Sequence, residues 1–223
     1  MLRFFRSAAA LALLVLLSGC QLTMVENLPA GAVPTCPAEW RGAWIAVDEA
    51  GRDDGDFGIV VHDDCGVESR EKGNPHPAKP PLPKPAFFQA NGGKQLVFLG
   101  AADAFDLIAA PSADGEKPSV GYVVLAWTRE GERMNMRQAD HRRAATLIVQ
   151  GALPGKVNWQ NDGSTSTVIV GGDPTSVADA FGRYDFFEGG GGFSLRRVGD
   201  DVKALERALK RATSQKAERK RKT

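Results

Sequence analysis

Two groups of acidic side chains are the first residues in this sequence whose types and spacing suit metal chemistry. One group runs from Asp48 to Asp56, and the other is the pair Asp63 and Asp64 beside His62. Ca²⁺ takes about six to eight oxygen ligands, but neither group has the alternating ligands and the final glutamate of an EF-hand loop. We therefore interpret both groups as solvated acidic turns.

A pair of methionines offers a second set of possible ligands. Met134 and Met136 lie two positions apart, and His141 follows shortly after them. Thioether and imidazole groups together can select copper, but alternate residues on one face of a strand more often fill a core. His141 also follows Asp140, a helix-capping residue type, and so belongs to another element. We expect the methionines in the core, and the sequence predicts no metal and no cofactor.

Nucleophilic catalysis requires a serine or cysteine beside a base. The chain has three histidines, and neither G-x-S-x-G nor H-E-x-x-H occurs in it. Ser69 and Lys72 match S-x-x-K, but the S-D-N and K-T-G elements of penicillin-binding enzymes are missing. The sequence therefore favours a non-enzymatic protein. A hydrolase whose site assembles from residues distant in sequence is the alternative.

The amino-terminal residues carry the clearest functional pattern. Two arginines, at positions 3 and 6, precede an unbroken apolar run at residues 8–17. A helix rises about 1.5 Å per residue, so this run reaches about half of a ~30 Å hydrocarbon core and indicates a secretory signal. The run ends in Leu17-Ser18-Gly19-Cys20, which resembles the lipobox of bacterial lipoproteins. An ordinary secretory signal with an incidental cysteine is the alternative.

The resemblance implies that residues 1–19 are a lipoprotein signal peptide and that Cys20 carries diacylglycerol. In this family an aspartate after the cysteine retains many members at the inner membrane. Gln21 stands there instead, so the outer membrane is implied. A tri-acylated cysteine, which carries one further acyl chain besides the diacylglycerol, would bury dozens of methylenes at about 0.8 kcal/mol each. Such an anchor is effectively permanent.

With Cys20 assigned to lipid, Cys36 and Cys65 remain in an oxidising compartment, so we expect them to form a disulfide. Closing a loop of about 30 residues would stabilise the fold by about 3.6 kcal/mol in the chain-entropy model. Two free thiols are the alternative. A redox or metal pair is disfavoured because the two cysteines lack C-x-x-C spacing.

The net charge of +1 conceals an acidic body and a basic end. Residues 20–199 hold 17 basic and 23 acidic side chains, whereas residues 200–223 hold nine basic and four acidic ones. An acidic body is unsuited to nucleic acid, which requires a positive surface. The basic end could contact an anionic surface, such as lipid headgroups. The side chains proposed for this contact are those of Lys216, Arg219, Lys220, Arg221 and Lys222.

The pattern of elements predicts an α+β fold, with an antiparallel sheet of about seven to nine strands and about three helices on one face. Residues 20–35, which contain prolines and no apolar periodicity, are expected to be a tether. Residues 36–212 would form one domain, interrupted by a loop at residues 73–85 that holds six prolines. Residues 213–223 are expected to be a disordered basic tail.

Strands are predicted from apolar alternation and helices from capping signals. Asp140, Asp173 and Asp200 are each expected to cap a helix, and Pro174 would occupy the first position of the second helix. The predicted strands lie at residues 40–47, 57–62, 86–90, 95–99, 105–110, 120–127, 133–137, 165–170 and 193–198.

Gly42-Ala43-Trp44 is similar to the G-x-W of lipocalins, which implies a barrel that carries small apolar ligands. Helices interleaved with strands after Asp140 depart from that pattern. The sequence therefore favours a lipid-anchored envelope lipoprotein on the periplasmic side of the outer membrane, bound to another envelope component. A lipocalin-like carrier is the alternative.

Overall fold

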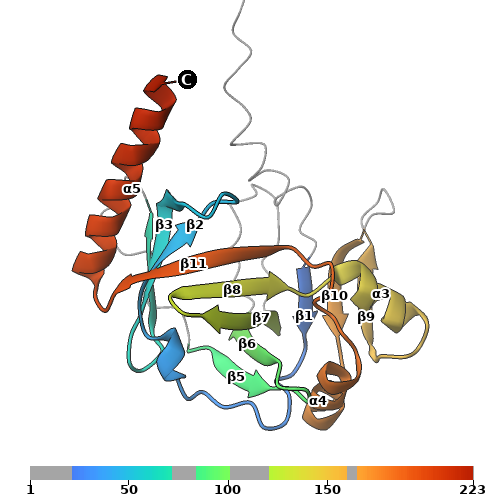
Figure 1. Cartoon of the computed structure of the whole chain (residues 1–223). Helices are drawn as coiled ribbons and strands as arrows, with labels where there is room; N and C mark the ends of the chain where they lie inside the picture. Colours follow the sequence, from blue (N-terminus) through green and yellow to red (C-terminus); the bar gives the residue numbers. More distant parts are fainter. Residues whose placement is uncertain (1–21, 72–83, 101–120, 160–164, 223) are drawn as a thin grey trace, which may run out of the picture.

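The computed structural model describes residues 22–71, 84–100, 121–159 and 165–222, and its elements confirm a mixed α+β fold (Figure 1). The helices are η1 (Ala38–Trp40), α3 (His141–Val149), α4 (Pro174–Arg183) and α5 (Val202–Lys222). The strands are β1 (Leu22–Val25), β2 (Gly42–Val47), β3 (Asp53–Val61), β4 (Val67–Glu71), β5 (Ala86–Gln89), β6 (Gln95–Gly100), β7 (Tyr122–Glu130), β8 (Arg133–Gln138), β9 (Gly155–Trp159), β10 (Thr165–Val170) and β11 (Gly192–Gly199).

All of these strands belong to one sheet of 11 strands, in the order β4-β3-β2-β11-β8-β7-β1-β10-β9. β6 also pairs with β7, and β5 pairs with β6. The predicted sheet was smaller and purely antiparallel, and both features were wrong. The sheet is larger because β1, β4 and β9 were not predicted as strands, and it is mixed because β1 pairs with β10 in parallel. The predicted strand at 105–110 and most of the proline-rich loop at 73–85 lie outside the described residues.

Eight of the strands pair antiparallel in the order β4-β3-β2-β11-β8-β7-β6-β5. They curve around one apolar cluster. Trp40 lies at its centre, with ring centroids 5.1 Å from Phe87 and 5.6 Å from Trp127. We call these residues the inner cluster: Cys36, Trp40, Trp44, Ile59, Val61, Cys65, Val67, Phe87, Val97, Leu125, Trp127, Met134, Met136 and Leu195. Side chains alternate along each strand, and α3, α4 and α5 pack on the opposite, outer face.

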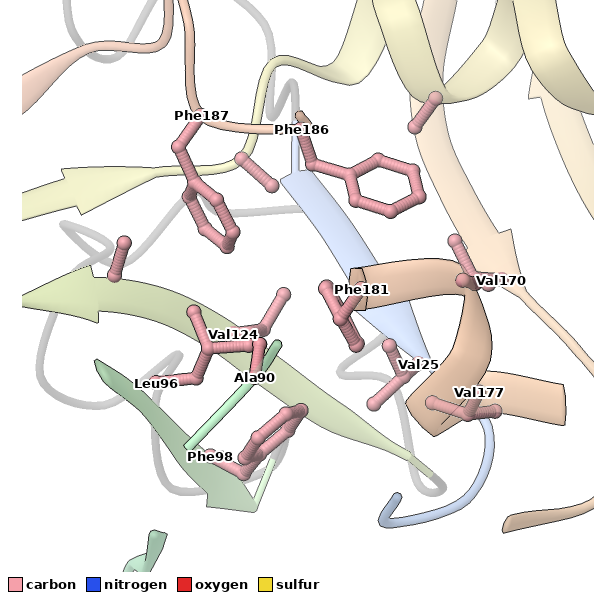
Figure 2. Packing of buried hydrophobic residues seen from close by; sticks show 14 of the residues in the cluster. Val25, Ala90, Leu96, Phe98, Val124, Val170, Val177, Phe181, Phe186 and Phe187 are labelled. Atoms are coloured by element: carbon pink, nitrogen blue, oxygen red, sulfur yellow. The ribbon is translucent and has the colours of Figure 1, made fainter. Parts of the chain in front are cut away.

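On the outer face, α4 covers the junction of β1, β6, β7 and β10 (Figure 2). Phe181 on α4 contacts three other rings, with centroid distances of 5.7 Å to Phe98, 5.2 Å to Phe186 and 6.3 Å to Phe187. Figure 2 shows Val25 on β1 and Val177 on α4 in the same cluster. The strand order thus places the first described residues inside the core.

Helix α5 occupies a separate part of the outer face, against β2, β3 and β11. Its Leu205 is fully buried and lies above Gly58, where a Cβ atom would come within 2.4 Å of Leu205 Cδ1. In Figure 1, α5 continues beyond the sheet, and its carboxyl-terminal end lies on the upper side of the molecule.

Two predicted helix starts are confirmed by their caps. The Asp140 carboxylate accepts hydrogen bonds from the backbone N–H groups of Arg142 and Arg143 at the start of α3. Asp173 does the same for α4, and Pro174 occupies the first turn. These helix starts could be predicted from the sequence because a cap bonds only to backbone groups two or three positions away.

Candidate functional site

The segment next to the predicted lipid anchor is part of the sheet. β1 begins at Leu22, two positions after Cys20, and it pairs with β7 on one side and β10 on the other. Met24 and Val25 have no exposed surface. A residue spans at most about 3.6 Å, so covalent geometry keeps residue 20 within about 7 Å of the start of β1. Cys20 itself lies outside the described residues.

The predicted tether at residues 20–35 is therefore wrong over its described part. After β1 the chain stays attached to the domain, because Ala30 N–H donates to Pro174 O and Val33 forms a bridge with Phe87. Prolines and polar residues suggested a free linker, but long-range backbone hydrogen bonds hold it. A membrane anchor at Cys20 would consequently hold the domain close to the bilayer.

The predicted disulfide is confirmed. Cys36 and Cys65 are bonded, with their Cα atoms 5.2 Å apart, and both belong to the inner cluster. Cys36 lies just before η1, which leads into β2, and Cys65 lies in the turn between β3 and β4. The antiparallel pairing of β2 with β3 brings these two positions together, as the sequence predicted.

Replacing both Cys36 and Cys65 with serine is expected to lower the free energy of unfolding by about 3.6 kcal/mol, because the unfolded chain regains the entropy of an open loop. Urea denaturation of the variant and of the wild type would measure this difference. Wild-type protein treated with reductant serves as the control and should match the variant. Equal stability of all three samples would mean that the bond contributes nothing to the fold.

The acidic turn between β2 and β3 is held by basic residues from elsewhere in the chain. Asp48 accepts hydrogen bonds within the turn, and its bond from Arg52 keeps the pKa of Asp48 below its usual value. Asp53 accepts two hydrogen bonds from the guanidinium of Arg196 on β11, at 2.9 and 2.5 Å. The expectation of a merely solvated turn was wrong at Asp53, which pairs across 143 positions.

Two further carboxylates, near the start of β3, bind α5. Lys216 Nζ lies 2.6 Å from Asp54 Oδ1 and 2.6 Å from Asp56 Oδ2. One turn earlier, the hydroxyl of Thr213 donates to Gly55 O at 3.1 Å. We call these residues, 54–56 with Thr213 and Lys216, the α5 clamp.

The α5 clamp corrects two expectations from the sequence. Residues 213–222 are helical, whereas a disordered tail at 213–223 was predicted. Lys216 binds carboxylates of its own chain, whereas a contact with an anionic surface was predicted for it. The other four residues predicted for that contact, Arg219, Lys220, Arg221 and Lys222, follow the clamp in the last turns of α5.

Substituting Lys216 with glutamine is expected to release the last turns of α5. Partial burial alone would lower the pKa of Lys216, but the bonds and charges of Asp54 and Asp56 outweigh it, and the net pKa is raised above 10.5. The stabilisation is therefore fully present below pH 10.5 and is lost as the pH rises through the raised pKa. Far-UV circular dichroism against pH would show the loss of helix in the wild type above pH 10.5.

Lys210→Gln is the matched control for the clamp, because Lys210 is an exposed lysine on the same helix. This control should keep the wild-type helix content and pH profile, whereas Lys216→Gln should have less helix already at neutral pH. Identical spectra for the two variants would show that the clamp does not hold α5.

An open cleft of about 250 Å³ lies where α5 begins and is lined by Val60, His62, Asp200, Asp201, Val202 and Lys203. The His62 ring is half-exposed, and its Nε2 lies 3.3 Å from Glu68 Oε2. The other Glu68 oxygen pairs with Arg70, whose side chain is almost fully buried. A histidine oriented by a carboxylate can act as a base, but no hydrogen bond in the described part of the chain joins His62 to a serine.

The acidic residues of the cleft have structural roles. Asp201 accepts a hydrogen bond from Ala204 N–H at 2.8 Å and so caps α5, while Asp200 pairs with Arg197. The helix cap predicted at Asp200 was wrong by one position, because Asp201 caps α5. The sequence analysis also missed Glu68 and Arg70. Opposite charges two positions apart on one strand face were the available signal for that pair.

The predicted core role of the methionines agrees with their burial. Met134 and Met136 are both buried in the inner cluster. His141 begins α3, where partial burial lowers the pKa of its ring, and its Nε2 is buried without a hydrogen bond. Across the segments that the structure describes, no three His, Cys, Asp or Glu side chains gather in a metal-binding group.

Trp44, the aromatic residue of the G-x-W pattern, is a fully buried residue of the inner cluster. Its indole N–H donates to Trp40 O at 2.8 Å, and the guanidinium of Arg129 lies 5.6 Å from its ring centroid. Packed side chains thus occupy the inner face, where a lipocalin-like carrier would hold its ligand.

Among the described helices, none has the length and apolar character needed to cross a bilayer. Comparison of the chain with known protein families, with curated proteins and with solved structures finds no match.

Proposed function

We propose that this chain is a non-enzymatic lipoprotein of the cell envelope, anchored by lipid on Cys20 at the periplasmic side of the outer membrane, where its domain binds another envelope component. The observation that carries the proposal is the pattern Leu17-Ser18-Gly19-Cys20 at the end of an apolar run. The lipid-bearing residue would stand two positions before β1, so the anchor would be attached close to the folded domain.

The packing of the domain supports binding by its surface rather than inside a cavity. The inner cluster fills the concave side of the sheet with three tryptophans and two methionines. Both carboxylates that line the cleft already have partners within the domain, since Asp200 pairs with Arg197 and Asp201 caps α5. A partner would therefore be recognised by exposed strands, turns and helix surfaces.

Replacing Cys20 with alanine tests the anchor. We expect the wild type to fractionate with membranes and to carry the added mass of acyl chains, because many buried methylenes hold it there. The variant should accumulate as an uncleaved precursor or as a soluble form. A variant with Cys36 and Cys65 replaced together is the control, since it removes cysteines without touching the anchor. Unchanged mass and fractionation in Cys20→Ala would overturn the proposal.

Crosslinking in intact cells tests the binding role. A reproducible envelope partner that is captured by the wild type, and lost when the domain is unfolded, supports the proposal. Failure to recover a partner in repeated experiments would count against it.

The hydrolase alternative has one observation in its favour, the His62 and Glu68 pair at the edge of the cleft. If His62→Ala lost an esterase or amidase activity that the wild type possesses, this alternative would replace the binding role.

A further inference from the structure

We propose that the end of α5 binds anionic lipid headgroups and thereby fixes the orientation of the domain on its membrane. The binding element, which we call the α5 tip, consists of residues 217–222. This inference rests on the proposed function, because the lipid on Cys20 would bring the α5 tip to the bilayer.

The α5 tip is strongly basic, and four of its residues have exposed side chains. Ala217, Glu218, Arg219 and Arg221 all have exposed side chains. The six residues contain four basic side chains and one acidic side chain, which gives a net charge of about +3. They have no apolar residue larger than alanine, so the chemistry that this segment recognises is anionic.

The α5 clamp presents the tip in a fixed direction. The bonds of Lys216 to Asp54 and Asp56, with the bond of Thr213 to Gly55, attach the helix to the body immediately before the tip. Six helical residues extend about 9 Å past Lys216 at about 1.5 Å each. That length slightly exceeds the roughly 5–8 Å depth of one headgroup layer, so the tip is long enough to place its basic residues within that layer.

The α5 tip and the direction of β1 can be compared in Figure 1. In Figure 1, α5 ends at the upper side, and β1 starts from its upper end and runs downward. Residue 20 lies within about 7 Å of that starting point by covalent geometry. Acyl chains on Cys20 would therefore bring a bilayer close to the end of the domain at which β1 starts.

Attraction between a basic residue and an anionic bilayer acts within a Debye length, about 10 Å at 0.1 M salt. Each such residue near the surface raises partitioning by about fivefold. This gain adds little to an anchor that is already effectively permanent. The expected role of the tip is therefore orientation, which must be measured as the position of the tip.

The test uses the full-length acylated protein, with Ala217 replaced by cysteine and labelled with an environment-sensitive fluorophore. The lipid on Cys20 and the bond between Cys36 and Cys65 leave residue 217 as the labelled thiol. The protein is reconstituted into phosphatidylcholine vesicles with or without phosphatidylglycerol, each with a lipid quencher at headgroup depth. We expect quenching with phosphatidylglycerol, loss of quenching at high salt, and little quenching in phosphatidylcholine alone.

Charge variants locate the effect in the tip. Arg219→Gln with Arg221→Gln should abolish the quenching that depends on phosphatidylglycerol. Lys210→Gln with Arg211→Gln removes the same charge from exposed positions before the clamp and should leave quenching intact. Equal quenching in both kinds of vesicle, or an equal effect of the two variant pairs, would overturn the proposal. A tip that is quenched only after an acidic envelope protein is added would assign it to a protein partner instead.

Failure of the anchor can be distinguished from failure of the tip. The mass of the same preparation shows whether Cys20 is acylated, and an unmodified mass overturns the proposed function. Co-sedimentation of the unacylated full chain with phosphatidylglycerol vesicles then measures the tip alone. Binding should fall roughly thirtyfold when Arg219 and Arg221 are both replaced by glutamine, and unchanged binding would overturn the inference.

Discussion

Replacing Val25 with aspartate is expected to unfold the domain. Val25 has no exposed surface and lies in the outer-face cluster, between Tyr122 on β7 and Val170 on β10. An unpaired buried charge costs several kcal/mol, which is comparable to the total stability of about 5–15 kcal/mol of a typical domain. Circular dichroism and limited proteolysis of the purified variant would show the loss of structure.

Val33→Asp is the matched control, because it introduces the same charge within the segment that was predicted as a tether. Val33 is 47% exposed, and its bridge to Phe87 uses backbone atoms that the substitution leaves in place. The control should keep the wild-type stability to within about 0.5 kcal/mol. If Val25→Asp were equally stable, residues 22–25 would be a tether and the central position of β1 would be wrong.

Replacing Trp44 with alanine is expected to lower the free energy of unfolding by about 3–5 kcal/mol. The variant loses the buried ring and its hydrogen bond to Trp40 O, and it leaves the guanidinium of Arg129 without its aromatic contact. For a domain of this size the midpoint of thermal unfolding should fall by roughly 10 °C. Thermal and urea denaturation of the purified protein would measure both quantities.

Phe193→Ala is the control for Trp44→Ala, because Phe193 is an aromatic residue that is 40% exposed. It should change stability by less than about 1 kcal/mol. A Trp44→Ala variant as stable as this control would show that the inner face is loosely packed. That result would revive the carrier alternative, and an apolar dye that bound the wild type would support it further.

Local chemistry made several elements predictable. The strand expected at residues 95–99 is β6, and the caps at Asp140 and Asp173 begin α3 and α4 as expected. Each of these signals depends on side chains within a few positions of one another. The disulfide was also predictable, since the hairpin of β2 and β3 brings Cys36 and Cys65 together.

Long-range pairing explains what the sequence did not show. β1 has only four residues, and it is a strand because β7 and β10 supply partners on both sides. The end of α5 has no apolar stripe, but Asp54 and Asp56 hold it through Lys216, about 160 positions away. Arg196, the partner of Asp53, likewise lies too far away in the sequence for a local pattern to predict the pair.

The pairing of β1 with β10 also limits how early the sheet can be completed during synthesis. A chain is made from its amino terminus at about 5–20 residues per second, and β10 lies about 145 positions after β1. The edge of β1 that pairs with β10 therefore lacks its partner for roughly 7–30 s, whereas β7, the partner on the other edge, is synthesised earlier. Over that interval the nascent polypeptide has an unpaired strand edge that can pair with another chain and aggregate. A holding chaperone that covers this strand would raise the yield of native protein.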